Sequence, residues 1–159
     1  GKIIVKNVRA GGYILGDEGS GAVLGKTFLS DVLKGLAPKD LMSNFFDKFR
    51  ITPNEVMESV YNRPFPNRFL STLSYFLADH TDNDYAYHLI TDNLRRFFTR
   101  NVCQYDYKSY PIRFVGSLAH TYATMLREVA REFGIELEVI EETPMNGLIE
   151  FHALNIEEP

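Results

Sequence analysis

Residues 13–21 read Tyr-Ile-Leu-Gly-Asp-Glu-Gly-Ser-Gly, and this stretch decides the expected fold. Residues 12–16 form an apolar run that is typical of a strand, and an amphipathic helix is predicted over about residues 22–36. Glycines let the backbone approach a ligand closely, and a helix N-terminus favours negative charge. We therefore expect a ligand site at this turn. Asp17 and Glu18 make a hydroxyl-rich substrate as good a candidate as a phosphate.

The composition limits the classes of protein to which the chain can belong. Its 159 residues, 45% of them hydrophobic, fit one domain with a packed core. The net charge of −4 argues against a nucleic-acid partner, because neutralising phosphates needs a basic surface. No apolar run has the length of a membrane span and no leader is recognised, so a cytoplasmic protein is expected. The first residue is Gly1 and not Met, which favours a piece of a longer protein.

A helical segment is predicted over about residues 41–102. Thr52, Pro53 and Glu55 have the pattern of a capping box with proline at the first helical position. Apolar residues at three- and four-residue spacing mark two further helices. These lie at about residues 69–77 and 87–98.

The second half of the chain alternates between strands and helices. Strands are predicted over residues 111–116 and 136–140, with a helix over residues 118–133 between them. A strand, helix and strand joined by short connections form a βαβ unit, which implies parallel pairing. A first strand over residues 2–6 and a last helix over residues 144–154 complete the pattern. The fold class is therefore α/β with a helical insertion.

Two interpretations remain open for each glycine turn. Asp17 either stabilises the start of the following helix or binds sugar hydroxyls through charge-assisted hydrogen bonds. Glu18 is expected to be a solvated acid in the first helical turn. Gly116 and Ser117 either admit a base or ribose against the backbone or form only a tight connection from strand to helix.

Other catalytic and metal-binding patterns are missing from the sequence. Residues 25–27, Gly-Lys-Thr, match the end of a P-loop, but Ser20 stands where that motif requires its first glycine. The four histidines form no zinc-binding pair, and no nucleophile elbow is found. The single cysteine, Cys103, excludes an internal disulfide. No catalytic or metal-ligating residue is therefore assigned in this chain.

The two glycine turns, in this order and with helices between them, resemble the BadF/BadG/BcrA/BcrD ATPase family, and especially its N-acetylglucosamine kinase branch. Residues 11–20 are similar to the Gly-Asp-Glu-Gly-Ser signature of that branch, with Gly11 where the branch has tryptophan. Residues 114–119 are similar to the adenosine-contacting turn of the actin, hexokinase and Hsp70 superfamily. Residues 145–148 resemble the closing Pro-x-x-Gly segment of the family.

The resemblance implies a fold and a set of binding residues. It implies that residues 1–159 form a ribonuclease-H-like lobe, the C-terminal one of two, with a helical insertion at about residues 41–102. In such kinases the sugar and ATP lie in the cleft between the lobes. The residues implied to bind the sugar are Gly11, Gly12 and Asp17. Those implied to face the adenosine of ATP are Gly116, Ser117 and Ala119.

The resemblance implies the C-terminal half of an ATP-dependent, Mg²⁺-dependent sugar kinase that phosphorylates N-acetylglucosamine or a related amino sugar. The first phosphate loop and the catalytic aspartate of the family are missing from this sequence, so the chain alone is expected to be inactive. Two alternatives remain open. One is an activator-type ATPase, which the lone Cys103 disfavours because such activators hold an iron–sulfur cluster. The other is a non-catalytic module that senses a sugar or nucleotide.

The expected partners follow from the same resemblance. They are the missing N-terminal lobe, the sugar substrate and a second copy of the chain in a homodimer. Neither nucleic acid nor a membrane is expected as a partner.

Overall fold

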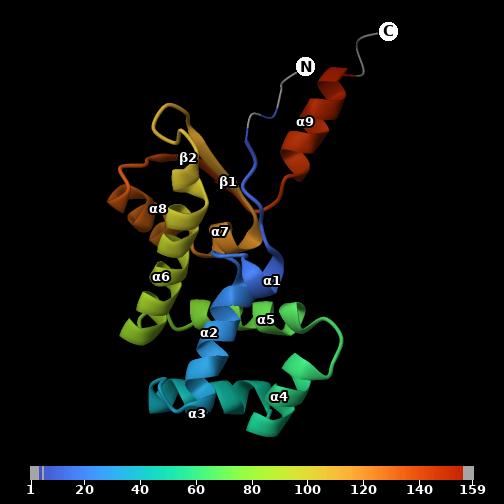
Figure 1. Ribbon diagram of the computed structural model, residues 1–159, viewed down its shortest axis with the longest axis vertical. Coiled ribbons are helices and arrows are strands. Elements are labelled where there is room, and N and C mark those ends of the chain that lie inside the picture. Colours follow the sequence, from blue (N-terminus) through green and yellow to red (C-terminus); the bar gives the residue numbers. More distant parts are fainter. Residues whose placement is uncertain (1–3, 5, 156–159) are drawn as a thin grey trace. The chain divides into compact units, whose positions relative to one another are not determined.

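The computed structural model describes residue 4 and residues 6–155 (Figure 1). The chain divides into two compact units, Gly1–Tyr105 and Asp106–Pro159. The described elements of the first unit are all helices, and the second unit contains a small parallel sheet. This confirms the mixed α/β composition that the sequence predicts. That the helices are an insertion into a single lobe stays a prediction.

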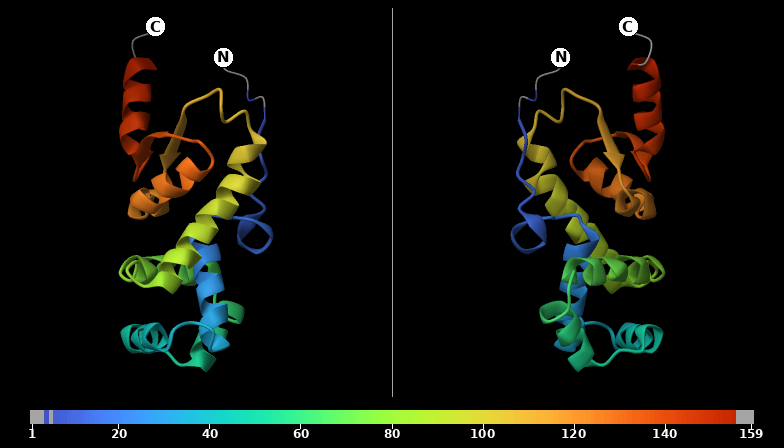
Figure 2. Two further views of the ribbon diagram at one scale, coloured as in Figure 1. Left: turned by 90° about the vertical axis from the view of Figure 1, so that its left-hand side faces the viewer. Right: turned by 90° about the vertical axis from the view of Figure 1, so that its right-hand side faces the viewer.

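The first unit is a set of helices that pack around α2. Helix α5 packs along α2, with α4 against α5 and α6 against α2, and both views of Figure 2 show α5 crossing beside α2. The helical range predicted at about residues 41–102 is confirmed. The elements are α1 (Gly12–Leu15), α2 (Gly21–Leu33), α3 (Lys39–Phe49), α4 (Pro53–Tyr61), α5 (Pro66–Ala78), α6 (Asp84–Arg100) and the short 3-10 helix η1 (Val102–Gln104).

The N-terminus of α4 is fixed by the capping box that the sequence predicts. The hydroxyl oxygen of Thr52 accepts a hydrogen bond from the Glu55 backbone N–H at 3.3 Å. The Glu55 carboxylate accepts one from the Thr52 backbone N–H at 2.8 Å. Two backbone donors that the helix leaves unpaired are thus satisfied locally. A local motif of four residues is therefore enough to set where this helix begins.

The core of the first unit is built on three fully buried phenylalanines from α2, α3 and α5. The ring centroid of Phe28 lies 5.6 Å from that of Phe45 and 5.5 Å from that of Phe76. Phe45 and Phe76 are 5.9 Å apart. Tilted and edge-on rings at these distances have favourable contacts beyond the area they bury. These contacts tie the three helices into one core.

The strand predicted over residues 12–16 is wrong, because this segment forms the single helical turn α1. Gly11 and Gly12 have φ angles of 74° and 70°, which turn the chain out of an extended path. The Gly16 N–H then donates to the Gly12 carbonyl at 2.8 Å and closes the turn. The two aliphatic residues of the segment are exposed, Ile14 to 70% and Leu15 to 82%. Their apolar character therefore does not reflect burial in a sheet.

The second unit confirms the predicted parallel pairing. Strands β1 (Ile112–Val115) and β2 (Leu137–Glu141) run parallel, with Arg113 opposite Val139 and an irregularity between Ile112 and Arg113. Helix α8 (Ala123–Glu132) packs against β2 and buries Val129. The last helix is α9 (Met145–Asn155), close to the predicted range.

The helix predicted over residues 118–133 is two helices. Helix α7 (Ser117–Thr121) ends at Tyr122, where φ is −105° and ψ is 28°, and α8 begins after it. The Tyr122 side chain is buried, so the break directs an aromatic ring into the interior. The strand expected over residues 2–6 lies largely outside the described residues. Among the helices that the structure describes, none has the length and apolarity of a membrane span.

Candidate functional site

The first glycine turn is a compact loop whose two ends meet. The Asp17 backbone N–H donates to the Ala10 carbonyl at 3.0 Å, so α1 is enclosed between these residues. A Cβ on Gly16 would lie 1.9 Å from the same carbonyl oxygen. No side chain fits at that distance, so the loop requires glycine at position 16. Residues 10–17 therefore form a closed loop, held by a hydrogen bond between its ends and dependent on glycine at position 16.

Asp17 lies at the end of this loop in the left-handed region, with φ of 58°. Its backbone carbonyl accepts a hydrogen bond from the Ser20 N–H at 2.9 Å. Ser20 is the N-cap of α2, and its hydroxyl oxygen accepts from the Val23 N–H at 3.2 Å. Asp17 thus supports the turn through its backbone, while Ser20 caps the helix. Within the described part of the chain, the half-buried Asp17 carboxylate accepts no hydrogen bond and forms no ion pair.

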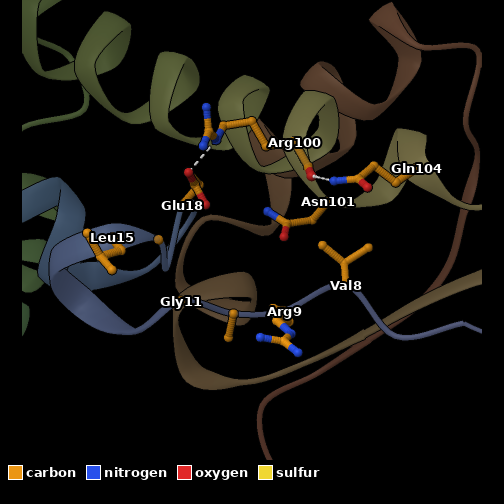
Figure 3. Close-up of a pocket in the computed structure, with 10 residues that line it drawn as sticks. Val8, Arg9, Gly11, Leu15, Glu18, Arg100, Asn101 and Gln104 are labelled. Atoms are coloured by element: carbon orange, nitrogen blue, oxygen red, sulfur yellow. Dashed lines mark hydrogen bonds and ion pairs between the residues drawn. The ribbon is translucent and has the colours of Figure 1, made fainter.

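Glu18 is not the solvated acid that the sequence predicts. Its side chain is only 11% exposed and forms an ion pair with Arg100, at the end of α6 (Figure 3). Burial raises the pKa of Glu18, but a backbone hydrogen bond and the charge of Arg100 outweigh burial and hold the pKa below its usual 4.5. The Glu18 carboxylate is therefore ionised and neutralised inside the turn.

A cavity of about 360 Å³ opens between this loop and the end of α6. In Figure 3, the labelled residues come from the segment of residues 8–18, which includes α1, on one side and from the end of α6 through η1 on the other. The segment is held by a hydrogen bond from the Val8 N–H to the Tyr105 hydroxyl at 2.8 Å. The cavity combines two guanidiniums, one carboxylate, two carboxamides and exposed backbone, which are groups that bind polar ligands. Its lining residues are Val8, Arg9, Ala10, Gly11, Leu15, Gly16, Glu18, Arg100, Asn101 and Gln104.

The three predicted sugar-binding residues lie on one loop, but they differ in whether they line the cavity. Gly11 lines the cavity, and Gly12 and Asp17 do not. Gly11 and Gly12 are exposed, and the Gly12 carbonyl already accepts the hydrogen bond from the Gly16 N–H. Sequence reasoning missed the part that α6 plays in this site, because its contacts join residues far apart along the chain.

The second glycine turn belongs to the second compact unit. Gly116 ends β1 and has a φ of 143°, a conformation that favours glycine. Its N–H donates to the Glu141 carbonyl at 2.8 Å, which ties the turn to the end of β2. A Cβ on Gly116 would meet nothing within 4 Å, so there is open space beside this backbone. Ser117 is exposed and Ala119 is half-buried on α7.

No side-chain cluster suited to a metal ion is found in the described residues. Three or more His, Cys, Asp or Glu side chains do not converge anywhere in this part of the chain. The polar groups at the two turns are instead backbone amides, hydroxyls, one free carboxylate and one paired carboxylate. Such groups recognise ligands by hydrogen bonding.

Comparison with known proteins gives one kind of match. Neither a protein-family model nor a curated protein matches the chain. Among solved structures, the chain is similar to a Porphyromonas gingivalis protein provisionally named as an N-acetylglucosamine kinase. The TM-score is 0.90 and the identity 43%, over 94% of this chain and 53% of that chain. The chain therefore spans about half the length of this neighbour, and the match supports a relationship to sugar kinases.

Proposed function

We propose that this chain is the C-terminal, ribonuclease-H-like lobe of an ATP-dependent sugar kinase related to the BadF/BadG/BcrA/BcrD family. The proposed substrate is N-acetylglucosamine or a related amino sugar. One observation carries the proposal: 94% of the chain matches the neighbour that bears this kinase name, at 43% identity. The same match, over only 53% of the neighbour, supports a second lobe as partner.

The first turn has the chemistry that a sugar site needs. The Asp17 carboxylate is free of partners among the described residues, so both of its oxygens can accept hydrogen bonds from neighbouring sugar hydroxyls. Gly11 and Gly12 expose backbone without side chains, which lets a sugar ring approach closely. The cavity beside Gly11, about 360 Å³, falls in the size range of small-molecule sites.

The second turn supplies the nucleotide contacts in this proposal. The open space at Gly116, with Ser117 and Ala119 after it, suits an adenosine against the backbone. ATP and Mg²⁺ would supply the phosphoryl group and its charge neutralisation. The phosphate loop and the catalytic base belong to the proposed second lobe, so the chain alone would bind ligands without turnover. A homodimer and a cytoplasmic location remain part of the proposal.

The test is sugar-dependent ATP turnover by the natural protein that contains this chain. Turnover is expected with N-acetylglucosamine, and Asp17→Asn should lower kcat/KM for the sugar about 100-fold, the size of a lost charged hydrogen bond. Asp47→Asn is the matched control, because Asp47 is an exposed carboxylate on α3. Turnover that ignores sugar would replace the proposal with an activator-type ATPase. Binding of sugar and ATP without turnover would replace it with a sensing module.

A further inference from the structure

One face of α6 contacts three consecutive residues of the first turn. Asn93, Phe97 and Arg100 are spaced four and three residues apart, which places them on the same side of a helix. The residues that they contact are Glu18, Gly19 and Ser20. The turn therefore has a support that comes from a distant part of the sequence.

Asn93 makes the most specific of these contacts. Its Oδ1 accepts a hydrogen bond from the Gly19 N–H at 3.1 Å, and its Nδ2 donates to the Ser20 carbonyl at 3.2 Å. The side chain is 6% exposed, so water does not easily replace these bonds. A carboxamide is the short side chain that offers an acceptor and a donor side by side. Asn93 therefore holds the peptide group before Gly19 and the peptide group after Ser20.

Phe97 and Arg100 complete the contact. A Cβ on Gly19, where φ is 81°, would lie 2.7 Å from the Phe97 Cβ, so the turn is pressed directly against α6. Arg100 forms an ion pair with Glu18, the residue directly before Gly19. Residues 18–20 are thus held by a hydrogen-bonded amide, a close backbone approach and an ion pair.

We propose that Asn93 is a positioning residue for the sugar-binding turn, acting on Asp17 through Gly19 and Ser20. Asp17 has a left-handed backbone, which is uncommon for residues other than glycine and depends on its surroundings to persist. Its carbonyl is bonded to the Ser20 N–H, and Asn93 holds the Ser20 carbonyl. Fixing the turn before a ligand arrives removes the ordering step from binding. This inference rests on the proposed sugar site.

The experiment compares Asn93→Ala with Asn44→Ala, an exposed asparagine on α3. The first measurement is amide hydrogen exchange in the 159-residue chain. Asn93→Ala is expected to speed exchange at Gly19 about tenfold or more, while core amides such as that of Leu73 keep wild-type rates. Asn93→Asp keeps the acceptor for Gly19 and should restore much of this protection. Unchanged exchange at Gly19 in Asn93→Ala would overturn the inference.

The second measurement is the kinetics of the natural protein that contains the chain. Asn93→Ala is expected to raise the KM for the sugar about tenfold and to leave kcat and the KM for ATP within about twofold. An equal rise in both KM values would mean a general loss of structure and would refute a positioning role. If Asn93→Ala does not fold, Asn93→Asp carries the test, because it loses only the donor to the Ser20 carbonyl and should raise the sugar KM without changing the KM for ATP. If the wild type shows no sugar-dependent turnover, the proposed function fails, while exchange at Gly19 still decides whether Asn93 fixes the turn.

Discussion

Gly25 on α2 packs directly against the backbone carbonyl of Leu70 on α5. A Cβ atom on Gly25 would lie 2.0 Å from that oxygen and 2.8 Å from the carbonyl carbon. Both groups are backbone, so neither can move aside by a change of rotamer. Helices α2 and α5 pack against each other and both contribute to the phenylalanine core. Their close approach therefore depends on the absence of a side chain at Gly25.

Gly25→Ala is expected to lower the free energy of unfolding by about 2–3 kcal/mol, because the two helices must separate to admit the methyl group. Urea unfolding followed by circular dichroism measures this. Gly147→Ala is the matched control: Gly147 also lies in a helix, α9, but its added Cβ meets nothing within 4 Å. Gly147→Ala should not lower the free energy of unfolding, since alanine has a higher helix propensity than glycine. Equal stabilities for the two variants would contradict the close packing.

The cap of α4 gives a second prediction. Thr52→Ala removes the hydroxyl that accepts from Glu55 N–H, and the expected loss is about 1 kcal/mol of unfolding free energy. Thr52→Ser keeps the hydroxyl and should stay within a few tenths of the wild-type value. The same urea unfolding experiment distinguishes them. A serine variant as unstable as the alanine variant would assign the effect to the lost methyl group.

The ion pair in the first turn makes stability depend on acid. The pKa of Glu18 is lowered in the folded chain, so its contribution is complete above its usual value of 4.5 and is lost as the pH falls through the lower, folded-state pKa. Glu18→Gln should therefore be less stable than the wild type at pH 7, by about 0.5–1 kcal/mol, because Arg100 is largely exposed. This gap should close as the pH approaches 3.

Urea unfolding at both pH values provides the measurement, with Glu142→Gln as control. Glu142 is exposed and lies in the second unit. Its variant should follow the wild type at every pH. A gap for Glu18→Gln that persists unchanged at pH 3 would show that the carboxylate charge is not its cause.

Tyr85 makes the stability of the fold depend on pH in the alkaline range, in the opposite direction to Glu18. Burial raises the pKa of Tyr85, and its 2.7 Å hydrogen bond to the Asp31 carboxylate raises it further. Above pH 10, the usual tyrosine value, the unfolded chain loses this proton while the folded chain keeps it, so stability falls as the pH rises. Tyr85→Phe should be less stable by about 1–2 kcal/mol at pH 8, and the gap should narrow above pH 10.

The unfolding free energy measured from pH 8 to pH 11 tests this, with Tyr75→Phe as the control. Tyr75 is exposed on α5, so its variant should track the wild type. A constant difference between Tyr85→Phe and the wild type across this range would mean that the phenol is not held neutral by Asp31.

The sequence predicts those parts of the fold that local patterns determine. The capping box at Thr52 and the parallel pairing of β1 with β2 are confirmed, since both follow from neighbouring residues or from short connections. The strand predicted over residues 12–16 is wrong because the left-handed backbone of Gly11 and Gly12 turns the chain there, and the apolar residues that follow do not reveal this turn. A pattern of apolar residues cannot show whether they are buried.

The support of the candidate site could not be predicted in the same way. Asn93 and Gly19 are 74 residues apart, and no local pattern marks an asparagine in the middle of a helix as a partner of a distant turn. From the sequence alone, Glu18 has the pattern of a solvated acid in a first helical turn, and only the three-dimensional structure shows its ion pair with Arg100. Tertiary contacts, and not residue type, decide both cases. The assignments of Gly11, Gly12, Asp17, Gly116, Ser117 and Ala119 to ligands stay predictions.

The support of the first turn by α6 restricts where this protein can gain or lose residues. Each residue added to a helix turns everything after it by about 100°. One residue inserted between Asn93 and Arg100 would leave a sound helix but carry Arg100 away from Glu18. We therefore expect insertions and deletions in α6 to disrupt this contact by rotating Arg100 away from Glu18, even at exposed positions where a substitution that preserves the helix would not.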